Sequence, residues 1–227
     1  SKYWNHNLRT AFEYDFSEES HVSVSYTGNY VPFRHNNSLT TGNYQTGNVD
    51  KYINTRMHNV TVQYKSEFGL DMGGDYTYYH SDNNQNLRAN FQNGERGYFD
   101  MKSGQGVDRY SIYADQKHRL ARNWELGYGA SFQFVRDKDF QIYNQVVGDI
   151  YTQNTSSDLK ETTTNFYVSM NKKSKTGASF SVSATGEYYT ISNYHKWAIY
   201  PQASFSYSKS LRHMFQLSLS TNKTYPS

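Results

Sequence analysis

The stretch HVSVSYTGNY, residues 21–30, alternates apolar or aromatic side chains with small polar ones at almost every step. Val22, Val24 and Tyr26 fall on one side of this pattern, and Ser23 and Ser25 on the other. Successive side chains of a β-strand point to opposite faces, so a period of two predicts a strand with one apolar and one polar face.

The same alternation recurs along the whole chain, and helical periodicity is nearly absent. GASFSVSATGEYY, residues 177–189, repeats it with serines on its polar face. The pattern predicts an all-β protein of about ten strands, which we place at residues 7–16, 21–30, 56–65, 69–80, 109–118, 124–135, 162–171, 177–189, 200–207 and 214–222.

Short and long connections between these strands alternate along the chain. The connections at 17–20, 66–68, 119–123, 172–176 and 208–213 are short, those at 32–55, 81–108 and 136–161 are long, and the one at 190–199 is intermediate. In an antiparallel meander, odd and even connections lie at opposite ends of the sheet. We therefore expect tight turns at one end and large loops at the other.

The composition excludes several classes of protein. The 227 residues include no cysteine, which excludes disulfides and cysteine-based zinc sites, and no apolar stretch reaches the ~20 residues of a membrane-spanning helix. The net charge of +3 gives no basic surface for nucleic acid. A mean hydropathy of −0.91 together with 23 tyrosines fits either a soluble β-protein or a transmembrane β-barrel.

The barrel explains the pattern better than a soluble sandwich. Strands of about ten residues, tight turns at one end and long loops at the other are typical of an up-and-down outer-membrane barrel. A sandwich does not confine its long loops to one end. Aromatic residues near the strand ends suit the interfacial girdles of such a barrel; they are Trp4, Tyr14, Phe16, Tyr30, Phe33, Tyr64, Phe68, Trp124, Tyr200 and Tyr207.

The C-terminal part carries a resemblance to a known family. Tyr200-Pro201 opens the alternating strand ASFSYS, a short turn with Arg212 follows, and residues 223–227 give a basic and aromatic-Pro-Ser end. This block, residues 187–227, resembles the outer-membrane β-barrel family of Bacteroidetes, the barrel part of TonB-dependent-receptor-like proteins. Residues 110–132 are similar to the mid-barrel hairpin of that family.

The resemblance implies a segment of a larger protein in the bacterial outer membrane. Barrels of this family have about 22 strands, whereas about ten are expected here, as a single barrel segment over residues 1–227 without a plug domain. The opening SKYWNHNL is not a signal peptide. Ten strands closing alone remain an alternative. The implied partners are outer-membrane lipid, the rest of the parent barrel and its plug, and, through the parent, a TonB-type protein and a surface lipoprotein.

The predicted function is uptake of a solute through extracellular loops and the barrel lumen, without enzymatic activity. A surface binding or adhesion barrel that does not transport is the first alternative. The second is an omptin-like hydrolase at the barrel rim, for which His35, His80 and His195 are candidates. No spacing pairs these histidines with a carboxylate, so we expect no catalytic residues.

The candidate ligand-binding residues fall into two groups, and no cofactor or metal site is expected, because the acidic loops lack calcium-loop spacing. Aromatic rings among amides suit the capture of sugars or peptides, and acids on the polar strand faces would contact a plug or a passing solute. The loop aromatics are Tyr44, Tyr52, Phe91, Tyr98, Phe99, Tyr143 and Tyr151, and the lumen acids are Asp71, Asp75 and Asp115.

Overall fold

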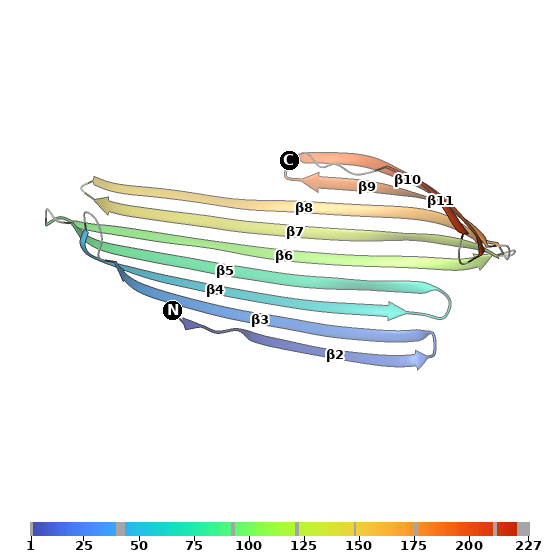
Figure 1. The fold of residues 1–227 in the computed structure, drawn as a ribbon, viewed down its shortest axis with the longest axis horizontal. Coiled ribbons are helices and arrows are strands. Elements are labelled where there is room, and N and C mark those ends of the chain that lie inside the picture. The colour runs from blue at the N-terminus through green and yellow to red at the C-terminus, as the bar shows by residue number, and fades with distance from the viewer. Residues whose placement is uncertain are drawn as a thin grey trace.

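The computed structural model describes residues 2–39, 44–91, 94–120, 123–147, 149–174, 177–210 and 213–221. These residues form one antiparallel sheet of 11 strands (Figure 1). The strands are β1 Lys2–Tyr3, β2 His6–Ser17, β3 Ser20–Leu39, β4 Tyr44–Lys65, β5 Leu70–Phe91, β6 Arg96–Leu120, β7 Trp124–Val147, β8 Asp149–Lys173, β9 Ala178–Ile191, β10 Tyr194–Ser210 and β11 His213–Ser220.

The first two strands are one strand with a short interruption. Tyr3 pairs with Phe33 and His6 pairs with Tyr30, so β1 and β2 follow β3 in the same register. Between them, the Trp4 amide still donates a hydrogen bond to the carbonyl of Pro32, at 3.3 Å. The sheet therefore has ten strands in effect, which confirms the all-β up-and-down meander expected from the sequence.

The sheet is curved but open. Strands follow one another in sequence order from β3 to β11, with β2 pairing β3 at one edge and β11 forming the other. Within the described residues, these two edges do not pair with each other. Figure 1 shows β9, β10 and β11 bending away from the plane of the longer strands. The structure has no helix long and apolar enough to cross a membrane among its described residues.

The long loops predicted from the sequence are wrong, because the strands continue through them. β4 to β8 have 22 to 25 residues each, and β7 and β8 stay paired out to Val147 and Asp149. The predicted loops at 81–108 and 136–161 are thus strand for most of their length. Residues rich in Asn, Gln and Gly have low strand propensity, but ladders on both sides supply hydrogen bonds that override this preference.

These continuations, which we call the extension, reach roughly 40 Å beyond the ten or so residues that cross a membrane, at about 3.3 Å per residue. The extension comprises residues 32–39 and 44–55 of β3 and β4, 81–91 and 96–107 of β5 and β6, and 136–147 and 149–161 of β7 and β8. The hairpin of β9 and β10 stops short of the end that the longer strands reach (Figure 1).

The strands are tilted as they are in a membrane barrel. His21 and Thr185 lie in one row of paired residues that crosses the sheet from β3 to β9. His21 is one residue from the start of β3, whereas Thr185 is seven residues from the start of β9. The turns therefore shift by about one residue per strand, a tilt of roughly 35° for a 3.3 Å rise and 4.8 Å strand spacing. Outer-membrane barrels tilt by about 35–45°.

The two faces of the sheet differ in polarity and in exposure. On β8, Phe166 and Val168 are 54% and 50% exposed, while the intervening Tyr167 and Ser169 are less accessible. Side chains on the outside of a curved sheet spread apart, so the apolar face is convex and the polar face is concave. Directly paired residues share a face, which puts even-numbered residues of β2 to β9 and odd-numbered residues of β10 and β11 on the convex face.

The apolar side chains do not form a protein core. Among the described residues, Ala89 is the one buried hydrophobic residue, whereas Ile112, Leu217 and many others are more than half exposed on the convex face. Lipid accounts for an apolar band of this kind. Most girdle aromatics near strand ends, including Tyr30, Tyr64 and Trp124, lie on this face, but Phe33 and Tyr200 lie on the concave one.

Candidate functional site on the concave face

The predicted lumen acids come together on the concave face near the short-turn end. Asp71 of β5 and Asp115 of β6 are direct cross-strand partners, and Asp75 pairs with Ser111 four residues further along the strands. Like charges placed directly opposite each other disfavour the pairing. Neighbouring donors must therefore stabilise these carboxylates.

Those donors come from the same face. The Tyr113 hydroxyl donates to Asp71 Oδ1 at 2.9 Å, and Gln63 Nε2 donates to the same oxygen at 3.2 Å. Gln63 also donates to the Tyr113 hydroxyl at 3.0 Å, and the Lys65 ammonium lies 3.8 Å from Asp71. The Ser111 hydroxyl donates to Asp75. The acids thus belong to a hydrogen-bonded wall that faces the interior of the curve.

Two glycines make this wall possible. A Cβ on Gly73 would lie 2.9 Å from Cε1 of Tyr113, and a Cβ on Gly129 would lie 2.7 Å from Cε1 of Tyr167. Each tyrosine ring therefore lies across a neighbouring strand where no side chain is present. This position brings the Tyr113 hydroxyl to Asp71, two residues from Gly73 on the same strand, and within reach of Gln63 on β4.

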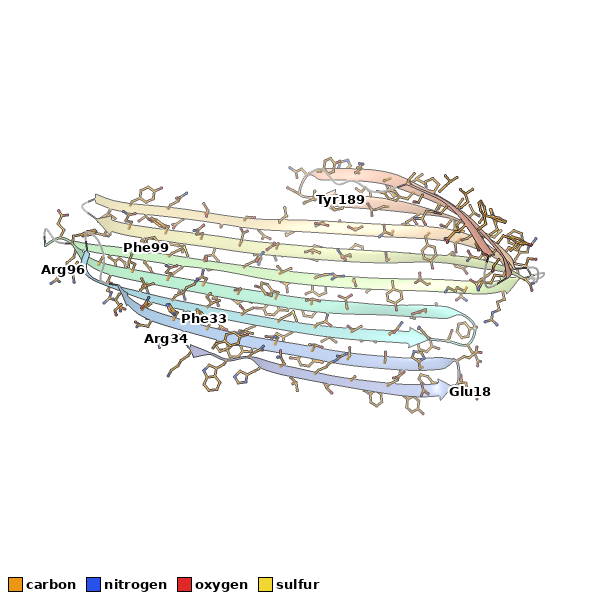
Figure 2. The ribbon with its side chains drawn as sticks, viewed as in Figure 1. Glu18, Phe33, Arg34, Arg96, Phe99 and Tyr189 are labelled. Carbon is orange, nitrogen blue, oxygen red and sulfur yellow. The ribbon has the colours of Figure 1, made fainter. Side chains whose placement is uncertain are left out.

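Three of the predicted aromatic residues form a cluster at the opposite end. Phe99 and Tyr143 have ring centroids 4.8 Å apart at 78°, and Tyr143 and Tyr151 have centroids 6.0 Å apart at 71°. They lie on the concave face of β6, β7 and β8, and we call them the aromatic cluster. Figure 2 shows Phe99 near the hairpin end of the sheet, far from Glu18 in a short turn.

The other predicted aromatics do not join this cluster, and none of the set lies on a long loop. Tyr52 and Tyr98 are on the convex face, and burial raises the pKa of Tyr52 above its ordinary value, with nearby Tyr30 adding to the effect. Phe91 ends β5 beside the hairpin tip. Tyr44 begins β4, but its side chain lies outside the described residues.

A polar hollow lies on the extension between the aromatic cluster and the acids. It has a volume of about 520 Å³ and is open to solvent. Asn83 Oδ1 is buried there without a hydrogen-bond partner among the described residues. Its lining combines hydroxyls, amides and the ring of Tyr79, and consists of Tyr79, Ser81, Asn83, Ser103, Gly104, Gln105, Asp139, Phe140, Gln141, Thr155, Ser156 and Ser157.

Sequence reasoning missed this hollow, although most of its lining residues are odd-numbered. Residues 81 to 83, 103 to 105 and 139 to 141 were expected on loops, where the parity of a residue carries no meaning. Because the strands continue through these segments, their odd-numbered side chains all lie on one face of the sheet. The arrangement can hold a neutral solute through hydrogen bonds and ring contacts, because little charge lines it.

The first hairpin brings together three side chains that can ligate a metal, although the sequence predicted no metal site. Glu13, Asp15 and His21 each offer a ligand atom, and these atoms lie within 4.8 Å of one another on the first hairpin. Glu13 and Asp15 are exposed, and His21 is partly exposed. Two strands contribute them, so no sequence spacing reveals the group.

The structure does not bring the rim-hydrolase candidates together. His35 lies on the concave face of β3, whereas His80 of β5 and His195 of β10 lie on the convex face. His80 Nε2 is 3.1 Å from Asp82 Oδ2, on a surface well separated from the hollow.

Comparisons with known proteins agree with this architecture. No protein-family model matches the sequence, and no curated protein matches it. A structure of the RagAB peptide transporter superposes with a TM-score of 0.62 at 8% identity, over 90% of this chain and 30% of that one.

Two receptors of Acinetobacter baumannii superpose less closely. The ferric preacinetobactin receptor BauA gives a TM-score of 0.50 at 9% identity, over 92% of this chain and 38% of that one. The siderophore receptor PiuA gives 0.50 at 7% identity, over 92% and 40%. The chain therefore spans 30–40% of the length of these proteins. These likenesses show the fold: the chain has the architecture of the wall of an outer-membrane β-barrel.

Proposed function

We propose that this chain is a non-enzymatic segment of an importer in the bacterial outer membrane, of the TonB-dependent-receptor-like kind. In this proposal a solute binds on the concave face of the extension, outside the membrane, and then passes along the polar wall through the lumen. The observation that carries the proposal is the polar hollow together with the aromatic cluster, both on the face that a closed barrel would enclose.

The arrangement along the strands supports a path. The aromatic cluster lies furthest out, the polar hollow comes next, and the wall of Asp71, Asp75 and Asp115 lies at membrane level. Rings and amides suit the first contact with a solute, and a hydrated hydrogen-bonded wall suits its passage. RagAB is named as a peptide transporter, BauA as the ferric preacinetobactin receptor and PiuA as a siderophore receptor, and these names support import over simple adhesion.

In this proposal, the remaining parts of the importer belong to the parent protein. A closed barrel needs partner strands for the edges β2 and β11, because an open edge in lipid leaves backbone groups unpaired. A plug inside the lumen would meet the carboxylates of the concave wall. A TonB-type protein would supply energy, and a surface lipoprotein would cover the extension. The Bacteroidetes origin is part of the same proposal.

A binding experiment tests the proposal with two probes, a tryptic peptide mixture and a ferric hydroxamate siderophore. The protein that contains this chain is purified in detergent, and bound probe is measured by native mass spectrometry for Tyr143→Ala and for Tyr98→Ala. Tyr98 is the control, because it lies on the convex face of the neighbouring strand, three pairs further out than Tyr143. We expect Tyr143→Ala to weaken binding of one probe by roughly two- to tenfold, in line with about 0.5–1.5 kcal/mol for ring contacts. Equal affinities of the two variants for both probes would refute capture on the concave face.

A further inference from the structure

The convex face carries an apolar groove in the membrane band. It crosses β4 to β8, has a volume of about 660 Å³ and is lined almost entirely by apolar atoms. Small residues Gly74, Ala114 and Ala130 form its floor, and Met72, Phe132 and Phe166 rise around it. The groove is therefore a depression of small residues surrounded by residues with large side chains.

Aromatic rings lie next to the groove, on the side toward the extension. Tyr76 and Tyr110 have centroids 4.7 Å apart at 27°, and Tyr110 and Phe134 have centroids 6.2 Å apart. These residues are direct partners in one row across β5, β6 and β7. Aromatic belts of this kind sit at the level of lipid headgroups.

Cations lie immediately beyond the rings on the same face. Arg136 and Lys138 of β7 and Lys160 of β8 are neighbours, since Arg136 pairs with Lys160 and Lys138 with Asp158. Arg136 donates two hydrogen bonds to Asp158, at 2.9 and 2.6 Å. Among the described residues, no carboxylate lies within 4.0 Å of the Lys138 or Lys160 ammonium.

A bare strand segment lies beside these cations. Gly106 of β6 pairs with His80 on one side and Lys138 on the other. A Cβ on Gly106 would meet one atom within 4 Å, His80 Nδ1 at 3.5 Å. The backbones of His80 and Lys138 thus lie on either side of Gly106, about 10 Å apart across two strand spacings. The His80 imidazole reaches toward Gly106 with Nδ1, while its Nε2 is 3.1 Å from Asp82 Oδ2.

We infer that this face binds an anionic, phosphate-bearing lipid of the outer leaflet, with its phosphate over Gly106 between Lys138 and His80 and an acyl chain in the groove. The order of chemistry along β7 matches one amphiphile: the cations Lys138 and Arg136, then the Phe134 ring, then the apolar groove. On β6, Asp108 pairs with Arg136 and accepts a hydrogen bond from the Tyr76 hydroxyl at 2.9 Å. Gly106 and Ile112 are six residues apart on β6, roughly 20 Å along the strand. A headgroup and the start of an acyl chain span that distance, whereas a free phosphate would use the cations alone. This binding does not depend on solute uptake.

The test uses dipalmitoyl phosphatidic acid as the probe and dipalmitoylglycerol as its uncharged counterpart. The protein that contains this chain is delipidated in detergent, and bound lipid is measured by native mass spectrometry during titration. We expect one tightly held phosphatidic acid per chain and no comparable retention of dipalmitoylglycerol. Lys138→Gln and Lys160→Gln should each weaken binding roughly fivefold, the typical effect of one basic residue near an anionic surface.

Two filling substitutions separate the headgroup position from the groove. Gly106→Ile covers the floor between His80 and Lys138 without changing charge, and Ala114→Phe fills the groove; both should weaken binding. Lys51→Gln is the control, because it removes the same charge from the concave face and should leave binding unchanged. Heat-modifiable gel migration confirms that each variant is folded.

Three outcomes would overturn the inference. They are equal retention of phosphatidic acid and dipalmitoylglycerol, an equal loss in Lys51→Gln and Lys138→Gln, and displacement of the lipid by millimolar inorganic phosphate. The last outcome would assign the cations to a soluble anion.

Discussion

At the scale of single residues, the glycines of the concave face decide how closely the wall can pack. Gly129 allows the Tyr167 ring to lie across β7, and Gly73 does the same for Tyr113 on β5. Both glycines are at odd-numbered positions on polar strand faces in the sequence. Their role in packing can be predicted only when the register of the neighbouring strands is known.

We predict that Gly129→Val destabilises the protein by about 1–3 kcal/mol, the usual cost of forcing extra methyl groups into a packed position. The ring of Tyr167 would have to leave its place. Gly186→Val is the control, because a Cβ there meets one atom at the contact limit, the Phe166 carbonyl oxygen at 3.9 Å. Urea unfolding in detergent, followed by tryptophan fluorescence, measures both. Equal midpoints for the two variants would contradict the packing described.

A second residue-scale prediction concerns pH. Hydrogen bonds from Arg136 hold the pKa of Asp158 below its ordinary value, and the nearby Lys138 and Lys160 act in the same direction. A lowered pKa in the folded state gives stability that is present above the ordinary pKa near 3.8 and is lost as the pH falls through the folded value. The wild-type protein should therefore unfold at higher urea than Asp158→Asn at pH 6, and this small difference should shrink as the pH is lowered below 3.8. A difference that grows with acidification would contradict the assignment.

At the scale of elements, the strands divide into a part that crosses the membrane and an extension. The sequence predicted the first part well. At the short-turn end of the sheet, nine of the ten expected strands have their terminus within two residues of the observed one. There one face meets lipid, and the alternation of Val22 and Ser23 is strict. The extension escaped prediction because water lies on both of its faces, so residues such as Asn83 and Asn84 need not alternate in polarity.

We predict that the extension of β5 and β6 can be removed without unfolding the membrane part. Asn83 and Ser103 are direct partners, so replacing residues 84–102 with an Asn-Gly turn joins the strands in register. The shortened protein should keep its heat-modifiable migration and lose binding of the solute probe, because Phe99 is removed. Loss of folding would show that the extension stabilises the sheet rather than serving capture.

The candidate site was predicted in part, for reasons that also belong to this scale. The alternation of polar and apolar residues identified the polar face of the strands that carry the acids. These acids, Asp71, Asp75 and Asp115, lie on one wall, as expected. Phe99, Tyr143 and Tyr151 are together, but Tyr52 and Tyr98 lie on the opposite face. The faces on which these aromatic residues lie depend on the strands continuing into the extension. The Asn-, Gln- and Gly-rich composition of these segments had instead indicated loops. The hollow around Asn83 and Gln141 arises from three hairpins, so pairing between distant segments had to be known.

At the scale of the whole molecule, the apolar surface has no protein to cover it. A soluble sheet with Ile112, Phe166 and Leu217 exposed on one face would aggregate, whereas lipid satisfies that face and water the other. The tilt of roughly 35° deduced from register and spacing is what a closed barrel in a membrane requires.

We therefore predict that a lysine has very different effects on stability at two adjacent positions. Ile112→Lys places a charge on the convex face within the apolar band and should cost about 2–4 kcal/mol of folding free energy in a bilayer. Ser111→Lys places it on the concave face beside Asp75 and should cost little. Unfolding of both variants in lipid vesicles gives the comparison. A loss for Ser111→Lys as large as for Ile112→Lys would refute the assignment of the faces.

The most direct measurement of the lipid-facing surface is a nitroxide scan along β6. The chain has no cysteine, so single cysteines at positions 109 to 116 can be labelled without background from this segment, and the accessibility of each label to oxygen and to a water-soluble nickel chelate can be compared in a bilayer. We expect a period of two, with even positions such as 112 and 114 accessible to oxygen and odd positions such as 111 and 113 accessible to nickel. Labels that all reach the nickel chelate, or accessibility without alternation, would contradict a strand that separates lipid from a watery lumen.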